Sequence, residues 1–364
     1  MEESCALCKS ESLIFYSTSS FLKGFNMGLQ IGEIVPRRAL EFSELKGKII
    51  HVDAFNTLYQ FLSTIRQPDG TQLMDKQGRV TSHLSGLFYR NVNLLMEGLK
   101  LVYVFDGKPP ELKFATNRLR QEAKDEAREK YQEAVDKEDI ALMGKYARQF
   151  TTLTQGLIEE SKELLEAMGI AVVQAPGEGE AQAAFLAKKQ GFAVASQDYD
   201  SLLFGAPRLI QNLTLARKRK TVSGVVYISP EMIDLEKVLN TLQITHDQLI
   251  CIGILSGTDY NPKGVHGIGQ KKALQLVRQY KQPALIFEAV KEKLDAQGNN
   301  FDWKEIYELF HKPNVENAEI VFPAMDAEKM KSILMDHDFS LERIESQMQK
   351  LKEGREKAKQ RTLF

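Results

Sequence analysis

The stretch KIIHVD at residues 48–53 decides the fold of this chain. It follows a break at Gly47, it is apolar and rich in β-branched residues, and it ends on the carboxylate of Asp53. Short apolar runs bounded by glycine are typical of strands that are buried on both faces of a sheet. Three further stretches repeat the pattern: LVYVFD at 101–106, IAVVQ at 170–174 and FAVAS at 192–196.

A helix is predicted between the last two of these strands. Residues 181–190 are rich in alanine and are followed by Gly191, a residue type that commonly ends helices. Strand, helix and strand together form a βαβ unit, in which the two strands run parallel. We therefore expect the α/β fold class, with a largely parallel, twisted central sheet and helices on both of its faces.

Composition excludes several classes of protein. Of 364 residues, 43% are hydrophobic and 27% are charged, which is typical of a soluble globular protein. No apolar run approaches the roughly 18 residues that a membrane span needs, so no membrane contact is expected. Cys5, Cys8 and Cys251 are too few for a disulfide framework, and a lone C-x-x-C pair does not predict a zinc site. We expect a cytoplasmic protein in a reducing interior.

Positive charge is clustered, although the net charge is only −1. A run of four basic residues occupies positions 217–220, Lys263, Lys271 and Lys272 form a second group, and the tail at 350–361 is a third. A polyanion responds to such local patches rather than to the net charge. The composition is therefore compatible with binding to nucleic acid.

Two other segments depart from the strand pattern. Residues 118–149 are dense in Glu, Lys and Arg with few apolar positions, which predicts helices that lie on the surface or stand off the core. Their simplest interpretation is a solvated helical pair. Around residues 250–280, two helices flank the glycine-rich loop 257–269, whose backbone N–H groups could face a phosphate.

Each of the four predicted strands is followed by one or two carboxylates: Asp53, Asp106, Glu178 with Glu180, and Asp198 with Asp200. Ligand sites in open α/β sheets form outside the carboxyl ends of the strands. These six side chains should therefore converge on one edge, where Asp259 could join them from the glycine-rich loop. Taken singly, each acid is more simply explained as a helix cap or a solvated charge. The repetition after four strands favours a common site.

A cluster of six or seven carboxylates requires positive charge, because like charges raise one another's pKa. Ligation by oxygen alone selects hard cations, so we expect two Mg²⁺ ions per chain, with Mn²⁺ as a substitute and Zn²⁺ disfavoured. Two such ions about 4 Å apart can activate a water and stabilise the leaving oxygen of a phosphodiester. The sequence thus predicts a metal-dependent nuclease.

From residue 27 to about residue 351, the chain resembles the flap endonucleases of the XPG nuclease superfamily, most closely the archaeal members. The resemblance rests on five motifs: VDA at 52–54, VFDGKPP at 104–110, APGEGEA at 175–181, SQDYDSLLFG at 196–205 and GTDY at 257–260. It implies that all seven acids bind metal. It also implies that the chain cuts 5′ flaps in branched DNA during replication (lagging-strand maturation) and repair, with 5′ exonuclease activity as well.

The resemblance implies functions for other residues too. Lys113 and Arg120 would be catalytic, at the base of a helical arch at about residues 113–152, where they steady charge that builds on the scissile phosphate. Tyr59 would stack on a base beside the cut, although its position on an apolar helix face is also that of a core residue. The remaining DNA-contacting residues in this half of the chain would be Arg66 and Arg90.

A helix–two-turn–helix element at about residues 246–280 is implied as the grip on duplex DNA, assisted by a K⁺ ion. Its DNA-binding residues would be Gly264, Gly267, Gly269, Lys271 and Lys272. The expected organisation is a single nuclease domain at 27–350, with an N-terminal nuclease region at 27–125 and an internal nuclease region at 153–285.

The two ends of the chain depart from the family pattern. Family members begin with Met-Gly, which is Met27-Gly28 here, and Gly28 is expected beside the DNA. Residues 1–26 would then be a disordered leader or the product of a start assigned too far upstream, and a regulatory leader is the less favoured alternative. The basic tail at 351–364 carries half of a motif for the sliding clamp (PCNA), so we expect weak clamp binding through Gln360, Leu363 and Phe364.

We expect a monomer, associated with the nucleoid in a prokaryotic cytoplasm. Three alternatives remain open: another nuclease of the superfamily, such as a 5′ exonuclease or a junction-cutting enzyme; a non-catalytic scaffold for branched DNA on the same fold; and a related ribonuclease domain with fewer acids. The full set of acids argues against the scaffold, and the glycine-rich duplex-binding loop argues against the ribonuclease.

Overall fold

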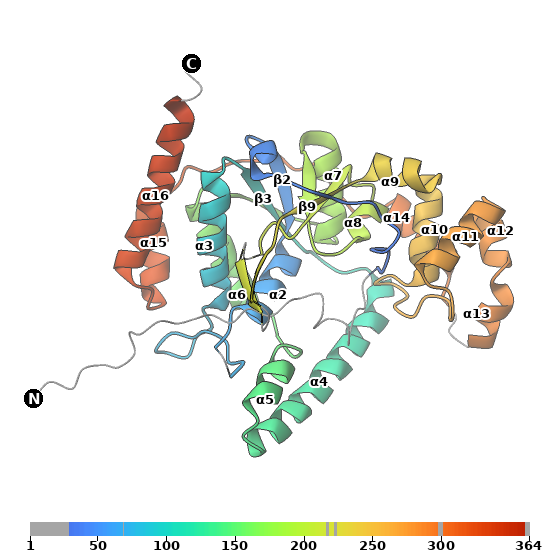
Figure 1. Ribbon diagram of the computed structural model, residues 1–364, viewed down its shortest axis with the longest axis horizontal. Helices are drawn as coiled ribbons and strands as arrows, with labels where there is room; N and C mark the ends of the chain where they lie inside the picture. Colours follow the sequence, from blue (N-terminus) through green and yellow to red (C-terminus); the bar gives the residue numbers. More distant parts are fainter. Residues whose placement is uncertain (1–28, 68, 216–217, 222–223, 298–300, 361–364) are drawn as a thin grey trace, which may run out of the picture.

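The computed structural model describes residues 29–67, 69–215, 218–221, 224–297 and 301–360. A seven-stranded sheet in the order β1–β9–β6–β5–β2–β3–β4 crosses the middle of the molecule (Figure 1). Its strands are β1 (Arg38–Ala39), β2 (Ile49–Asp53), β3 (Lys100–Phe105), β4 (Ala171–Gln174), β5 (Ala193–Ala195), β6 (Arg208–Gln211) and β9 (Glu231–Asp234). A separate antiparallel hairpin is formed by β7 (Lys218–Thr221) and β8 (Gly224–Tyr227).

The predicted parallel core is confirmed. Strands β5, β2, β3 and β4 are neighbours and run parallel, with Val52 opposite Tyr103 on one side and Ala195 on the other. Strand β6 continues the parallel part, whereas β9 runs antiparallel to both β6 and β1. The sequence pattern misses β6 (RLIQ) and β9 (EMID) because each has only a short apolar pair between polar residues.

Helices cover both faces of the sheet, as expected (Figure 1). One face carries α2 (Ala54–Thr64), α3 (Ser82–Met96) and α6 (Gln155–Ala167), with α15 (Ala327–Asp336) and α16 (Leu341–Gln360) outside them. The opposite face carries α7 (Gly179–Gln190). A third apolar cluster unites α8 (Asp200–Leu203), α9 (Leu235–Leu242), α10 (His246–Ser256), α11 (Gln270–Tyr280), α12 (Pro283–Glu288), α13 (Lys291–Gln297) and α14 (Trp303–His311).

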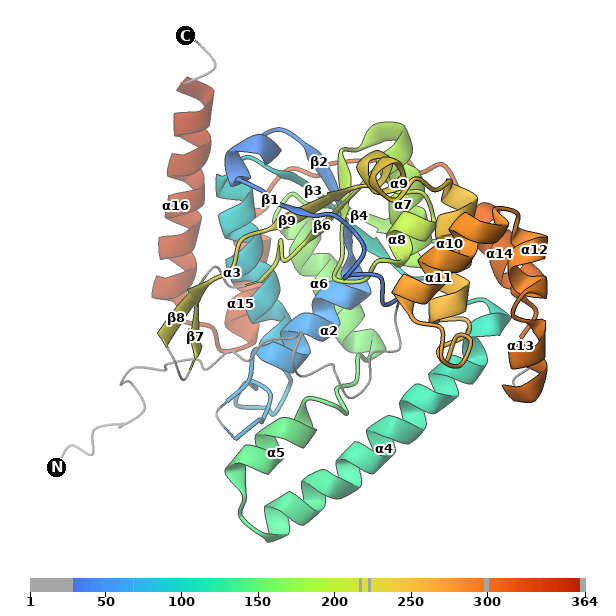
Figure 2. The ribbon, with the colours of Figure 1, turned by 45° about the vertical axis from the view of Figure 1, so that its right-hand side comes forward.

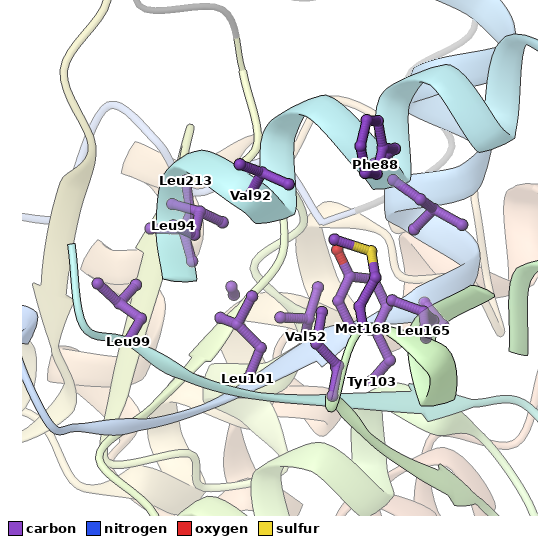
Figure 3. Close-up of a cluster of buried hydrophobic side chains, with 14 of the residues drawn as sticks. Val52, Phe88, Val92, Leu94, Leu99, Leu101, Tyr103, Leu165, Met168 and Leu213 are labelled. Carbon is purple, nitrogen blue, oxygen red and sulfur yellow. The ribbon is translucent and has the colours of Figure 1, made fainter. Parts of the chain in front are cut away.

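Alternation along β3 divides its side chains between the two faces. Leu101 and Tyr103 point towards α3 (Figure 3), whereas Val102 belongs to the cluster beneath α7. Tyr103 is fully buried, and its hydroxyl donates a hydrogen bond of 2.9 Å to Oδ1 of Asn91 in α3. Because an unpartnered hydroxyl in this position would cost free energy, the bond helps to orient α3 on the sheet.

The helix predicted at residues 181–190 is α7, which begins two residues earlier, at Gly179. Gly191 follows it, but with φ −137° and ψ 179° its backbone is extended rather than left-handed. A side chain at this position would collide with His51, because an added Cβ would lie 2.3 Å from Cε1 of that ring. Glycine is therefore required here for close packing against β2, and not to end the helix.

Helices α4 (Phe114–Asp136) and α5 (Ile140–Ala147) project from the body of the molecule as an arch, after a short 3-10 turn at Glu111–Lys113 (Figure 2). Within α4, which is described in full, the buried residues are Thr116, Ala127 and Ala134. The prediction of helices that stand off the core is confirmed. A second 3-10 turn, Phe42–Leu45, precedes β2. Among the described helices, none is long and apolar enough to cross a membrane.

Candidate active site

Six of the predicted acids lie at the ends of four neighbouring parallel strands: Asp53 at the end of β2, Asp106 directly after β3, Glu178 and Glu180 after β4, and Asp198 and Asp200 after β5. The chain passes from β2 to β3 and β4 on one side, and then returns to β5 on the other side of β2. This reversal creates a topological switch point, where open α/β sheets bind ligands. The topology therefore brings these side chains to one edge of the sheet.

Two glycines let neighbouring loops approach each other closely. The Gly107 N–H donates to the carbonyl oxygen of Gly177 at 2.6 Å, which joins the loop after β3 to the loop after β4. A Cβ on Gly179 would lie 2.8 Å from Oδ1 of Asp106, and the Gly179 N–H donates to that same oxygen. Glycine at this position thus allows the first turn of α7 to hold the carboxylate.

Asn56 of α2 links two of the acid-bearing strands. Its side-chain Nδ2 donates to Oδ2 of Asp198 at 2.8 Å, and its backbone N–H donates to Oδ1 of Asp53 at 3.0 Å. The hydroxyl of Ser196 adds a second support, because it accepts the Asp198 N–H at 3.2 Å. Sequence reasoning missed both residues, although Asn56 stands three positions after Asp53, which is the spacing of a helix N-cap.

Burial and mutual repulsion make the carboxylates hard to ionise. Burial, reinforced by the neighbouring Asp106, raises the pKa of Asp53 to about 8. Burial also raises the pKa values of Asp106 and Asp198, and it raises those of Glu180 and Asp200 well above their ordinary range. Such a cluster needs added positive charge to stay ionised near neutral pH.

Two basic side chains from the base of the arch supply part of this charge. Lys113 forms ion pairs with Glu178 and, at 3.3 Å, with Asp259, while Nη2 of Arg120 lies 2.6 Å from Oδ1 of Asp259. Burial by itself would lower the pKa of each base, but the carboxylates outweigh it and raise the pKa of both. The predicted basic pair therefore lies against the acids, and Asp259 joins the cluster as its seventh member.

Two uncharged residues of this site were missed by sequence reasoning. Thr116 is fully buried, and its hydroxyl donates to the carbonyl oxygen of Asp259 at 2.5 Å. The hydroxyl of Tyr260 donates to Oε2 of Glu178. The helical spacing of Thr116, three residues after Lys113, places both on one face and was the available signal.

The donor set suits magnesium or manganese, since hard cations prefer carboxylate oxygens. Oδ1 of Asp200 is buried, and among the described residues it has no hydrogen-bond partner. A divalent ion would satisfy this oxygen and the charge of the cluster together. Within the described part of the chain, no three His, Cys, Asp or Glu side chains are already gathered as a metal cage. Glu178 and Asp259 instead form ion pairs with Lys113 and Arg120.

Tyr59 lies in α2 on the side facing the arch. It is 37% exposed, and Nζ of Lys124 from α4 lies 5.3 Å from the centre of its ring. The ring is therefore partly exposed and lies beneath Lys124 rather than in the core. Arg90 lies in α3, where burial lowers the pKa of its guanidinium.

Arg66 is placed inside the protein, with 6% of its surface exposed. Its Nε donates to the carbonyl oxygen of Leu62 at 2.8 Å, its Nη1 to that of Gly70 at 2.7 Å, and its Nη2 to Oγ1 of Thr151 at 2.7 Å. These bonds fasten the loop after α2 to the end of the arch. Direct contact of Arg66 with DNA stays a prediction, while its structural function is visible.

Helices α10 and α11 flank the loop at 257–269, as expected. Gly264 and Gly267 have φ of 52° and 74°, in the left-handed region that favours glycine, whereas Gly269 is the N-cap of α11 with φ −89°. A hollow of about 380 Å³ lies beside this loop, and it is lined by Gln30, Glu33, Ser256, Gly269, Gln270, Lys271 and Lys272. The Ser256 hydroxyl is buried there, without a hydrogen-bond partner among the described residues.

Other predicted features lie outside the described residues: the leader 1–26, Cys5, Cys8, Gly28, Arg217, Leu363 and Phe364. The backbone of α16 is described up to Gln360. Cys251 is a free, buried thiol in α10.

Comparison with known proteins agrees with this geometry. The XPG N-terminal domain matches residues 23–127, and the XPG I-region matches residues 169–259. Flap endonuclease 1 of Pyrococcus furiosus is 52% identical over 93% of this chain and 98% of that protein. Flap endonuclease 1 of Hyperthermus butylicus is 48% identical over 90% of this chain and 95% of that protein.

Solved structures resemble the chain in the same way. The flap endonuclease-1 of Methanococcus jannaschii has 40% identity and a TM-score of 0.68, covering 89% of this chain and 98% of that one. The catalytic core of Rad2 in complex with DNA substrate, with 23% identity and a TM-score of 0.66 over 88% of this chain and 97% of that one, shares the fold. Fold and acid cluster together define a nuclease of the XPG class. Within that class, the chain belongs to the flap endonuclease family.

Proposed function

We propose that this chain is a structure-specific nuclease that removes 5′ flaps from branched DNA by metal-dependent phosphodiester hydrolysis, in replication and repair, and that it also trims 5′ ends exonucleolytically. The observation that carries the proposal is the set of buried carboxylates at four neighbouring strand ends, with Lys113 and Arg120 beside them. Membership of the flap endonuclease family supports the substrate class.

Two Mg²⁺ ions, or Mn²⁺ in their place, would be held by the seven acids: Asp53, Asp106, Glu178, Glu180, Asp198, Asp200 and Asp259. When bound, they activate a water and stabilise the leaving oxygen of the phosphodiester. The protein's contribution is to orient these ligands in advance. Asn56 does so for Asp53 and Asp198, and Gly179 does so for Asp106.

Lys113 and Arg120 would act on the scissile phosphate, where fixed positive charge stabilises a transition state that gathers negative charge. They are anchored at the start of the arch, so a strand that passes the arch reaches them beside the acids. Tyr59 would stack on a base next to the cut, since its exposed ring lies between α2 and α4.

Duplex DNA would be held at the loop between α10 and α11. The exposed Gly267 and Gly269 allow backbone N–H groups to approach phosphates, and Lys271 and Lys272 add positive charge. Gly264 is buried against the end of α10, where its N–H donates to Asn261, so it would shape the loop. The hollow beside this loop supports a K⁺ site, since the buried hydroxyl of Ser256 has no hydrogen-bond partner within the part of the chain that the structure describes. Arg90 would contact the duplex as well, whereas Arg66, which is enclosed in the protein, would support this surface by fastening the loop after α2 to the end of the arch.

The relatives of this chain are archaeal, and the proposal includes a monomeric protein that works on nucleoid DNA in the cytoplasm. Contact with a sliding clamp would run through Gln360, Leu363 and Phe364. Helix α16 supports such a contact, since its end points away from the arch (Figure 2).

One assay tests the function. End-labelled double-flap DNA, a nicked duplex, a blunt duplex and a four-way junction are each incubated with the protein in Mg²⁺ and in chelator. We expect selective cleavage of the flap in Mg²⁺, with a 5′-phosphate and a 3′-hydroxyl at the cut. Preference for the four-way junction would instead identify a junction-cutting nuclease. Tight binding of the flap without cleavage in Mg²⁺ or Mn²⁺ would identify a scaffold.

A further inference from the structure

We infer that Lys113 and Arg120 are the counter-ions of Glu178 and Asp259 when divalent metal is absent, and that metal binding releases them, so that metal occupancy loosens the base of the arch. This inference rests on the proposed metal site and adds a regulation of it. The released side chains would then be free to meet a phosphate.

The attachment of the arch is concentrated in the first turns of α4. Lys113 is the residue directly before α4, and Thr116 and Arg120 follow it at three and seven positions, so that the three share one side of the start of the arch. All three bond to Asp259, at 3.3 Å, 2.5 Å and 2.6 Å respectively, and Lys113 also bonds to Glu178. The loop that carries Asp259 is thereby joined to the arch at three points.

Other charged residues of α4 behave differently. Arg118 pairs with Glu122, Arg128 with Asp125 and Lys130 with Glu126, all within the helix itself and all well exposed. Such exposed pairs contribute little to stability. The ion pairs of Lys113 are largely shielded from solvent, and the pair of Arg120 is shielded on the side of Asp259. All of them are directed at the nuclease body, so they dominate the electrostatic attachment of the arch.

A carboxylate that ligates a divalent cation is a poor partner for a second cation at close range, because the two positive charges repel each other. Metal binding at Glu178 and Asp259 would therefore weaken their bonds to Lys113 and Arg120. By linkage, the same ion pairs must weaken metal binding by the same factor. The bond from Thr116 joins two neutral groups and is not subject to this competition, so it keeps α4 in place as a pivot.

The first test measures metal affinity without DNA. Mg²⁺ or Ca²⁺ is titrated into the full-length, metal-free protein by calorimetry. We expect Lys113→Ala and Arg120→Ala to bind metal about fivefold to tenfold more tightly than wild type, because each removes a competing charge. The control is Lys124→Ala, on the same helix with the same charge but placed over the ring of Tyr59, for which a change below about twofold is expected.

The second test measures the arch directly, by hydrogen–deuterium exchange. We expect Mg²⁺ to accelerate exchange in the first turns of α4 by about fivefold in wild type. In the Lys113→Ala/Arg120→Ala double variant, exchange should already be fast and insensitive to metal. Thr116→Val should speed exchange with and without metal. Thr116→Ser, which keeps the hydroxyl, should exchange at the slower wild-type rate.

The outcomes separate this inference from the proposed function. If no divalent ion binds, the metal site itself is refuted. If metal binds but exchange in α4 is unchanged or slower, or if Lys124→Ala tightens binding as much as Lys113→Ala, the counter-ion inference alone fails.

Discussion

Replacing Asp200 by asparagine should make the metal-free protein more stable while it removes activity. Asp200 is the first residue of α8, it is 6% exposed, and its Oδ1 has no hydrogen-bond partner among the described residues. Burial, followed by the charges of Asp259 and Asp198, raises the pKa of Asp200 well above its ordinary value. Asparagine keeps the shape of the side chain without the charge, so the repulsion disappears.

The size of the effect follows from the burial of this charge. A buried charge without full compensation costs about 3–5 kcal/mol, and the nearby Lys113 offsets part of that cost. We therefore expect the free energy of unfolding to rise by about 2–3 kcal/mol, or Tm by roughly 4–6 °C in a chain of this size. The rate of flap cleavage should fall at least about 100-fold, because a proposed metal ligand is lost.

Scanning calorimetry at pH 8, in chelator and in Mg²⁺, is the appropriate measurement. Mg²⁺ should stabilise wild type more than the variant, because the stability added by a ligand that binds only the folded state increases with the logarithm of its affinity. Asp326→Asn is the matched control. Asp326 caps α15 by accepting the Lys329 N–H at 2.9 Å, and asparagine caps a helix about as well. Its stability should change by less than about 0.5 kcal/mol.

A variant that melts below wild type in chelator would contradict the argument from repulsion. Cleavage at the wild-type rate in Mg²⁺ would exclude Asp200 from the metal site, whatever the stability shows.

Three further predictions follow from the site. Arg66→Met should lower the free energy of unfolding by about 2–4 kcal/mol in urea denaturation, because the buried acceptors on Gly70 and Thr151 lose their donor; unchanged stability would rule out the structural function of Arg66. In chelator, the folded state should keep the proton of Asp53 up to about pH 8 while the unfolded state loses it near pH 3.8, so stability is lost as the pH rises through this window. Asp53→Asn should remove this contribution to the dependence of the free energy of unfolding on pH, which urea denaturation at several pH values measures. A difference in unfolding free energy between variant and wild type that stays constant with pH would count against the prediction. Lys271→Ala should reduce the slope of log K against log salt for duplex binding by about one. Lys113→Ala should instead lower kcat with little effect on the affinity for DNA. Equal losses of DNA affinity in the two variants would refute this distinction between a duplex-binding and a catalytic lysine.

Much of the framework could be predicted from the sequence because its causes are local. The run at 48–53 contains the β-branched residues Ile49, Ile50 and Val52, and short apolar runs of that kind occur in buried parallel sheets. Once the four strands are parallel, their carboxyl ends must share one edge, and the acids that follow them must share it too. The sparse apolar positions in α4 likewise predict a helix that stands away from the core.

What only the tertiary structure decided is the partner of each polar group. Asn56 reaches Asp198 across 142 positions of sequence, and Thr116 reaches Asp259 across 143. Arg66 could have been an exposed contact for DNA, but packing of the arch against the loop after α2 encloses it. A local pattern specifies which face of an element is buried, whereas hydrogen bonds between distant segments depend on how those elements meet in space, and no spacing along the chain records that.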